Sequence, residues 1–233
     1  MWSHFLFWVA DIGNTTGAAD VEAEASENGQ MPPSPKPLSV PDPICQEWVC
    51  LLRGINVGGK GKIAMLELRK LCEELGWRNV STYIQSGNIV FSSTQADADE
   101  VRSLLEPRLL QNWQIKTTAI LRTAEQWKQV IEENPMAQHA RAAPSKMLVS
   151  FLSGSVSPMQ MDSFQQDLQA LAPGAEELAL RGTALYIYFP MGMGTSKLNI
   201  TKVEKLLGCT STARNWNTVL KLNEMLSSLP RRG

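Results

Sequence analysis

Apolar positions between residues 47 and 122 follow two periods, one typical of strands and one typical of helices. Runs of alternating or continuous apolar residues predict strands, and apolar residues three or four apart predict helices. The predicted strands cover residues 48–53, 80–85, 88–92 and 115–121, and the predicted helices cover residues 65–75 and 97–109. This β-α-β-β-α-β order is that of a ferredoxin-like unit.

Residues that favour turns and caps support these boundaries. Ser86-Gly87 joins the two middle strands and is typical of a hairpin turn. Asp97 or Asp99 is predicted to cap the second helix. Pro107 lies inside that helix and is expected to kink or shorten it, because an interior proline removes a hydrogen bond.

The same order begins again after a connecting helix, in which Thr123 is the predicted cap and Gln126 lies at the capping-box position. The second half predicts a strand at 146–152, a helix opened by Ser157-Pro158, a hairpin of 177–181 and 184–189, and a helix at 198–207. No final strand is predicted. A helix at about 213–226, capped by Ser211 or Thr212, is expected in its place.

The predicted fold class is therefore α/β (α+β), with two ferredoxin-like β-α-β-β-α units and a C-terminal helix. Residues 1–46 are rich in Ala, Glu, Ser, Gly and Pro and predict a disordered tail, with a docking segment or a transit peptide as the alternatives. The predicted domains are residues 47–122, a linker helix and loop at 123–145, and residues 146–229.

Charge is unevenly distributed along the chain, whose net charge is −1. Residues 1–47 contain seven acidic residues and one lysine, which leaves 21 basic and 16 acidic residues, or +5, for the remainder. A mild positive charge suits an anionic ligand, but it is far below that of a dedicated nucleic-acid binder.

The expected compartment is the cytoplasm. No apolar run is long enough to span a bilayer, so no membrane partner is predicted. The four cysteines, Cys45, Cys50, Cys72 and Cys209, form no C-x-x-C pair, which favours a reducing compartment without structural zinc. Cys50 and Cys72 lie in apolar patterns and are expected to be inert core thiols.

A glycine-rich, cationic loop follows the first predicted strand. Residues 53–62 contain four glycines together with Arg53, Asn56, Lys60 and Lys62. Glycines allow backbone N–H groups to turn towards an anion, so the loop predicts a phosphate site or a purely structural turn. The P-loop pattern fits up to Lys60 but fails at Gly61, where Ser or Thr would ligate Mg²⁺.

A second loop, residues 190–197, ends in Ser196-Lys197 just before a predicted helix, whose N-terminus would favour an anion. Arg214 and Asn215 are placed in the first turn of the last predicted helix, where Arg214 is expected to line one cleft with Arg53. The candidate ligand-binding residues are Arg53, Asn56, Lys60, Lys62, Gln85, Ser86, Asn88, Ser196, Lys197, Arg214 and Asn215.

Acid-base groups are scarce. The only histidines are His4, in the predicted tail, and His139, in a predicted polar loop, and no His or Cys cluster has metal-ligand spacing. The sequence therefore favours binding over hydrolysis and names no catalytic residue or cofactor.

The motifs at residues 52–60, 83–88, 196–198 and 212–218, taken in order, resemble those of the family called domain of unknown function 1697. The resemblance spans about residues 47–229 and implies an α/β architecture with ferredoxin-like units. It implies no established activity, so it assigns no catalytic role to any residue.

Three function classes remain open at this point. The first is a protein that binds a phosphate-bearing small molecule or a short nucleic acid through the cationic loops. The second is a phosphoryl- or nucleotidyl-transfer enzyme that uses the same loops, and the third is an interaction scaffold whose loops serve folding alone.

Overall fold

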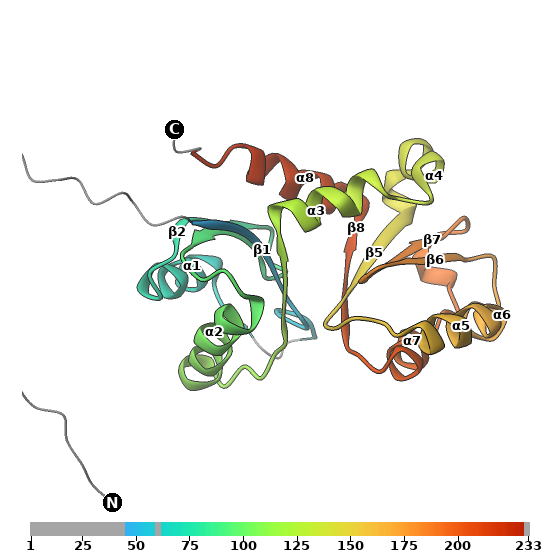
Figure 1. Cartoon of the computed structure of the whole chain (residues 1–233), viewed down its shortest axis with the longest axis horizontal. Coiled ribbons are helices and arrows are strands. Elements are labelled where there is room, and N and C mark those ends of the chain that lie inside the picture. The colour runs from blue at the N-terminus through green and yellow to red at the C-terminus, as the bar shows by residue number, and fades with distance from the viewer. Residues whose placement is uncertain (1–44, 59–61, 231–233) are drawn as a thin grey trace, which may run out of the picture. The chain divides into compact units, whose positions relative to one another are not determined.

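The computed structural model describes residues 45–58 and 62–230 of the 233-residue chain (Figure 1). The predicted tail lies outside the described residues except for Cys45 and Gln46, and so does Lys60. The described part forms two four-stranded antiparallel sheets, one in each half of the chain. The predicted α+β class with two ferredoxin-like units is confirmed.

The first half has the predicted order of elements. These are β1 (Gln46–Leu52), α1 (Met65–Glu74), β2 (Arg78–Tyr83), β3 (Asn88–Ser93), α2 (Ala98–Trp113) and β4 (Ala119–Thr123). The strand order in the sheet is β2-β3-β1-β4, so β1 and β3 are central and β4 is an edge strand. This is the arrangement of a ferredoxin-like unit.

The second half repeats this order after a connection of α3 (Ala124–Glu132), α4 (Ala137–Ala142) and the 3-10 turn η1 (Pro144–Lys146). Its elements are β5 (Met147–Leu152), α5 (Pro158–Gln166), α6 (Leu168–Leu171), β6 (Glu177–Arg181), β7 (Ala184–Tyr188), η2 (Met193–Thr195), α7 (Ile200–Leu207), β8 (Ser211–Asn215) and α8 (Trp216–Ser227). The strand order β6-β7-β5-β8 matches that of the first sheet position by position.

The prediction that the second half lacks its final strand is wrong. Residues 211–215 form β8, which pairs antiparallel with β5 from Leu148↔Asn215 to Leu152↔Ser211. The strand was missed because it contains no large apolar residue that would mark a period. Asn215, and not Ser211 or Thr212, caps the following helix by accepting a hydrogen bond from the Asn217 amide.

Caps and turns were predicted more accurately. Asp97 caps α2, and Thr123 and Gln126 form a complete capping box at α3. Of the two expected effects of Pro107, the shortening of α2 is wrong, because the helix continues through it to Trp113, and the kink stays a prediction. Tertiary packing of its buried face against the sheet compensates for the lost hydrogen bond.

Each sheet is buried on both faces. In β1, Trp48 and Cys50 pack under α1 and α2, whereas Val49 and Leu51 point to the opposite face, as the period of two requires. Figure 1 shows α1 and α2 on one side of the first sheet and α5, α6 and α7 beside the second. The remaining faces of the two sheets share one core with α3 and α8.

Hydrogen bonds fasten this shared core. The ring of Trp127 on α3 stacks on Phe151 of β5 with 4.8 Å between ring centroids, and its Nε1 donates to the Val219 carbonyl of α8 at 3.2 Å. The buried Tyr186 hydroxyl donates to the Val130 carbonyl at 2.7 Å. The two halves are therefore joined by an apolar core with directional bonds inside it.

Candidate functional site

The glycine loop after β1 is held in shape by Asn56. The residue has a positive φ of 58°, and its Nδ2 donates to the carbonyls of Ile63 at 3.1 Å and Gln85 at 2.8 Å. Its Oδ1 accepts from the Ile63 amide at 2.9 Å. Both side-chain donors of Asn56 therefore close the loop and tie it to the β2–β3 hairpin, and Lys62 remains exposed beside it.

The hairpin turn between β2 and β3 is also fixed by its own side chains. Asn88 is fully buried, and its Nδ2 donates to the Tyr83 carbonyl at 3.1 Å and to Ser86 Oγ at 2.9 Å. Asn88 Oδ1 accepts from Arg214 Nε. Gln85 is exposed, and its carbonyl is the acceptor for Asn56.

Arg214 lies in strand β8 and not in a helix, and it is 8% exposed. All five of its N–H donors have acceptors within the protein: Asn88 Oδ1, Thr212 Oγ1 at 2.8 Å, and the carbonyls of Ala213 at 2.8 Å and of Leu52 and Ser86 at 3.1 Å each. Burial lowers the pKa of this guanidinium to about 10. Three of these acceptors belong to the first half, so Arg214 joins the halves.

Arg53, at the end of β1, makes a different contact with the second half. Its Nη2 lies 2.9 Å from Glu204 Oε2 on α7, and the arginine side chain is 43% exposed. The other oxygen, Glu204 Oε1, accepts from the Ser211 amide at 2.6 Å and the Ser211 hydroxyl at 2.9 Å. Arg53 and Arg214 thus both lie at the end of β1, one partly exposed and one buried.

The sequence predicts that a helix begins directly after Ser196-Lys197 in the second glycine loop, and the structure differs. The helix begins at Ile200, and Asn199 caps it by accepting from the Lys202 amide at 3.1 Å. The Lys197 amide donates to Glu176 Oε1 at 3.1 Å. Hydrogen bonds from the Ser196 side chain and from the backbone lower the pKa of Glu176, so this loop already holds a carboxylate of the chain itself.

The side chain of Asn215 makes hydrogen bonds that stabilise the fold. Besides capping α8, its Nδ2 donates to the carbonyls of Ser145 at 2.9 Å and Met147 at 3.2 Å. These bonds fix the segment that leads into β5. The predicted candidates thus divide into buried or hydrogen-bonded residues, and partly exposed ones such as Arg53, Lys62 and Lys197.

The cysteines in the apolar patterns are core residues, as expected. Cys50 and Cys72 are fully buried, and burial raises the pKa of Cys50 to about 12. His139 lies in α4, with Nε2 3.2 Å from Glu177 Oε2 and its ring stacked on Tyr188. Across residues 45–58 and 62–230, no group of His, Cys, Asp and Glu side chains could hold a metal ion, and no helix is long and apolar enough to cross a membrane.

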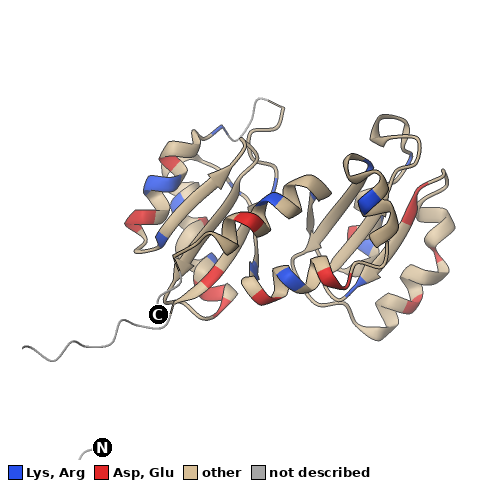
Figure 2. Cartoon of the chain, turned by 90° about the horizontal axis from the view of Figure 1, so that it is seen from above, with Lys and Arg blue, Asp and Glu red and all other residues tan. Residues whose placement is uncertain are grey.

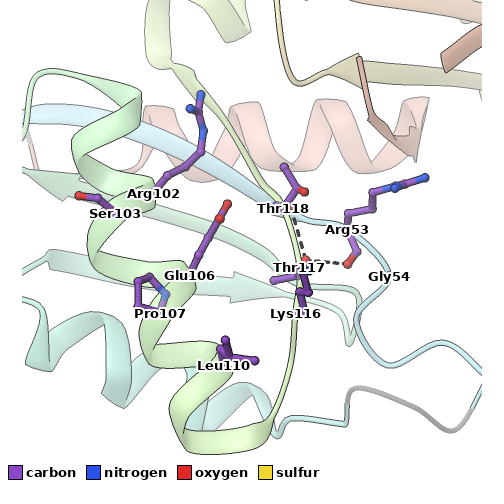
Figure 3. Close-up of a pocket in the computed structure, with 10 residues that line it drawn as sticks. All are labelled: Arg53, Gly54, Arg102, Ser103, Glu106, Pro107, Leu110, Lys116, Thr117 and Thr118. Carbon is purple, nitrogen blue, oxygen red and sulfur yellow. Dashed lines mark hydrogen bonds between the residues drawn. The ribbon is translucent and has the colours of Figure 1, made fainter. Parts of the chain in front are cut away.

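A cavity of about 1060 Å³ opens beside the end of β1, between α2 and the extended segment that precedes β4. We call it the α2 cavity. Its lining residues are Arg53, Gly54, Arg102, Ser103, Glu106, Pro107, Leu110, Lys116, Thr117 and Thr118 (Figure 3). Three of them are cations and one is a carboxylate, and Arg214 is not among them.

Two of the three cations of the α2 cavity, Arg102 and Lys116, are weakly engaged. Arg102 pairs with Asp99 one turn earlier on α2, and the Asp99 side chain is 83% exposed. Lys116 is exposed and has no hydrogen bond or ion pair to any residue that the structure describes. Figure 3 shows the Arg53 side chain extending away from α2, in keeping with its contact to Glu204.

The remaining polar groups of the cavity are oriented by the backbone. Glu106 Oε1 accepts from the Ala119 amide at 2.8 Å, and Thr117 Oγ1 donates to the Arg53 carbonyl at 2.7 Å. Sequence reasoning missed Arg102, Glu106 and Lys116. The only signal for Arg102 and Glu106 was the polar face of α2 opposite Val101 and Leu105, which any surface helix also has. Lys116 lies beyond α2 and had no such signal.

A smaller cavity of about 310 Å³ lies beside the second glycine loop. Its walls include Phe189, Met191 and Lys197, together with Glu176. Because the Glu176 carboxylate already accepts the Lys197 amide, this loop offers less to an external anion than the α2 cavity does.

The paired sheets and the bonds between them define a protein built from two ferredoxin-like units that share one core. The family described as "Protein of unknown function (DUF1697)" matches residues 45–186, which is more than half of the chain, and the chain belongs to this family. The motifs at residues 196–198 and 212–218 lie beyond the matched part.

One solved structure supports the fold. The chain is similar to the conserved bacterial protein SP0830 from Streptococcus pneumoniae, with 25% sequence identity and a TM-score of 0.57. The similarity covers 78% of this chain and 99% of that one. Among curated proteins, none matches the chain.

Proposed function

We propose that the protein binds a nucleotide-sized, phosphate-bearing ligand in the α2 cavity. The observation that carries the proposal is that Arg53, Arg102 and Lys116, from three separate segments, line one cavity whose described lining includes a single carboxylate. An excess of cations in a concave site raises the local concentration of anions and orients them.

The existing ion pairs leave these cations available to a ligand. Exposed pairs such as Arg102–Asp99 contribute only about 0–1 kcal/mol, so a phosphate can replace the carboxylate at little cost. An arginine binds phosphate through two parallel hydrogen bonds, which adds both strength and direction. Arg53 would turn from Glu204 towards the ligand at a larger cost, because the Glu204 side chain is only 12% exposed.

Cavity size and lining support a nucleotide over a bare phosphate. A volume of about 1060 Å³ slightly exceeds the range of about 300–1,000 Å³ for small-molecule sites, so the cavity has room for a whole nucleotide. Pro107 and the exposed Leu110 give one wall an apolar surface on which a base can pack. Figure 2 shows basic and acidic segments interspersed on the helices of both halves, which favours a single nucleotide over a long nucleic acid.

Within this proposal, the hydrogen-bonded motif residues act as scaffold. Asn56, Ser86, Asn88 and Arg214 hold the first loop, the hairpin and β8 together at the end of β1. Their effect on binding is to fix the backbone that carries Arg53 and Gly54. The proposed ligand contacts are Arg53, Arg102 and Lys116, with Lys62 and Gln85 as contacts only for a ligand that extends along the glycine loop.

A thermal-shift series with adenosine 5′-monophosphate and inorganic phosphate tests the proposal. At a hundredfold excess over Kd, a bound ligand stabilises the fold by about 2.7 kcal/mol. The Arg102→Ala and Lys116→Ala variants should lose most of that shift. Arg108→Ala is the matched control, because Arg108 is on the same helix, pairs with Glu74 and does not line the cavity.

Two outcomes would reject the proposal. One is that neither compound moves the wild-type unfolding midpoint at any concentration up to about 10 mM, where even a weak site would respond. The other is that Arg108→Ala weakens the ligand response as much as Arg102→Ala does, since the effect would then be general charge and not the cavity.

A further inference from the structure

Glu106 and Glu204 occupy equivalent places in the two halves. Each lies on the helix that precedes the last strand of its sheet, and each uses Oε1 to accept the amide of the first residue of that strand. The distances are 2.8 Å from Glu106 to Ala119 N and 2.6 Å from Glu204 to Ser211 N. This shared bond fixes both carboxylates in the same orientation relative to their sheets.

The second oxygen, Oε2, has different surroundings in the two carboxylates. Glu204 Oε2 pairs with Arg53, the residue that follows β1. The residue that follows β5 in the same position is Ser153, as shown by its amide bond to the Thr210 carbonyl, which matches the bond from the Arg53 amide to the Thr118 carbonyl. Ser153 is too short to reach α2, and its hydroxyl oxygen accepts from the Thr210 amide at 3.2 Å instead.

Glu106 Oε2 is therefore left without a hydrogen-bond donor among the residues that the structure describes, and it lines the α2 cavity. Figure 3 shows the carboxylate pointing towards the segment that contains Thr117 and Thr118. Arg102 lies one turn before Glu106 on α2, but its ion pair is with Asp99. The cavity thus presents one unoccupied anionic acceptor among three cations.

We infer that the ligand of the α2 cavity is a nucleoside phosphate that donates a hydroxyl or amino hydrogen to Glu106 Oε2. The inference rests on the proposed function and adds the second recognition group. A carboxylate in a cationic cavity repels the charged phosphate group itself, so its presence favours an anion that carries donors apart from its phosphate group. Ribose hydroxyls and base amino groups are the donors that a nucleoside phosphate offers.

The test uses Glu106→Gln in the full chain. Glutamine keeps an oxygen for the Ala119 amide but replaces the free oxygen with an NH₂ group, and it removes the negative charge. We expect the affinity for adenosine 5′-monophosphate to fall by at least about tenfold, because a hydrogen bond to a charged acceptor is lost. The affinity for inorganic phosphate should rise, because the repulsion is removed.

Glu100→Gln is the matched control, since Glu100 is an exposed residue of the same helix and does not line the cavity. Both ligands should bind this variant with affinities within about twofold of wild type. If Glu106→Gln instead binds both ligands more tightly, Glu106 is only a structural acceptor and the inference is wrong while the proposed function stands. If neither ligand binds the wild-type protein, both fail together.

A second measurement does not depend on the fold of any variant. Titration of wild-type protein with 2′,3′-dideoxyadenosine monophosphate and with purine riboside monophosphate removes the ribose or the amino donor from the ligand. One of the two should bind at least about tenfold more weakly than adenosine 5′-monophosphate, and that one identifies the donor. Equal affinity for all three nucleotides would overturn the inference.

Discussion

Arg214 in the second half and Arg122 in the first occupy equivalent positions, since each faces a valine of the central strand, Val149 and Val49 respectively. Both are 8% exposed, and both reach the opposite half. Arg122 donates to the carbonyls of Leu121 at 2.7 Å, Leu152 at 2.8 Å and Thr183 at 3.0 Å. Arg214 makes the corresponding bonds to Ala213 and Leu52, and its third carbonyl acceptor is Ser86, one residue before the counterpart of Thr183.

The two arginines differ in what surrounds the rest of the guanidinium. Arg214 has Asn88 beside its Nε, where the equivalent residue in the other sheet is Ala184. Arg122 Nε consequently has no partner among the described residues, and the guanidinium lies over the Phe151 ring at 5.8 Å instead. Burial lowers the pKa of both side chains to about 10.

The two arginines show how a protein with two similar sheets protects the edge strand of each. β4 and β8 are edge strands, and an unpaired edge exposes carbonyls that would accept another strand. Each arginine donates to the carbonyl of the residue before it and to the carbonyl at the end of the central strand in the other half. The halves therefore depend on each other, and the second half supplies the better-paired arginine.

Removal of either arginine is expected to have the largest effect on the free energy of unfolding. The two losses should differ, although the two residues occupy equivalent positions. Arg214→Ala leaves five acceptors without a donor, several of them buried, and should reduce the free energy of unfolding by about 4 kcal/mol. Arg122→Ala leaves three and should cost about 2–3 kcal/mol. Chemical denaturation of both variants measures the difference.

Arg108→Ala serves as the control for loss of an exposed arginine and should change stability by less than about 0.5 kcal/mol. An equal or larger loss for Arg122→Ala than for Arg214→Ala would mean that the ring of Phe151 compensates fully for the missing acceptor. In that case the number of hydrogen bonds that each arginine donates would not predict which arginine stabilises the fold more.

The hairpin glycines give a second, smaller contrast. Gly87 has φ of 70°, and a Cβ there would lie 2.8 Å from Leu52 Cβ, whereas a Cβ on Gly182, with φ of 53°, would meet nothing within 4 Å. Gly87→Ala should cost about 3 kcal/mol, since it adds an overlap to the backbone strain, and Gly182→Ala about 1 kcal/mol. Thermal or chemical unfolding measures the stability of the two variants. Similar losses of stability would show that Leu52 moves aside freely.

The fold was predictable as far as local rules determine it. The two hairpins, the Thr123 capping box and the helix opened by Ser157-Pro158 are local patterns, and all are confirmed. Strand β8 was not predicted, because Thr212 and Arg214 are buried although they are polar, and Arg214 is hydrogen-bonded to Asn88, Leu52 and Ser86 of the other half. A period of apolar residues cannot reveal a strand whose buried side chains are polar.

The candidate site was less predictable for the same physical reason. Arginine and asparagine beside a glycine turn are typical of anion clamps, but the same groups satisfy buried carbonyls, as Arg214 and Asn56 do. Which role they take depends on long-range contacts that a sequence does not contain. Arg102 had no local signal beyond a polar helix face and Lys116 had none, because the two line one cavity only when α2 packs against the segment before β4.

The smallest effect is expected at Ser150, the counterpart of Cys50 in the first half. Ser150 is fully buried between β7 and β8, and its hydroxyl has no partner among the described residues. A buried, unpaired hydroxyl costs about 1–3 kcal/mol, so Ser150→Ala should raise the free energy of unfolding by about 1 kcal/mol after the lost contacts are counted. Ser150→Cys, which copies the first half, should be at least as stable as wild type, because a thiol loses less on burial. A loss of more than about 1 kcal/mol in both variants, measured by urea denaturation, would show that the Ser150 hydroxyl forms a hydrogen bond in solution.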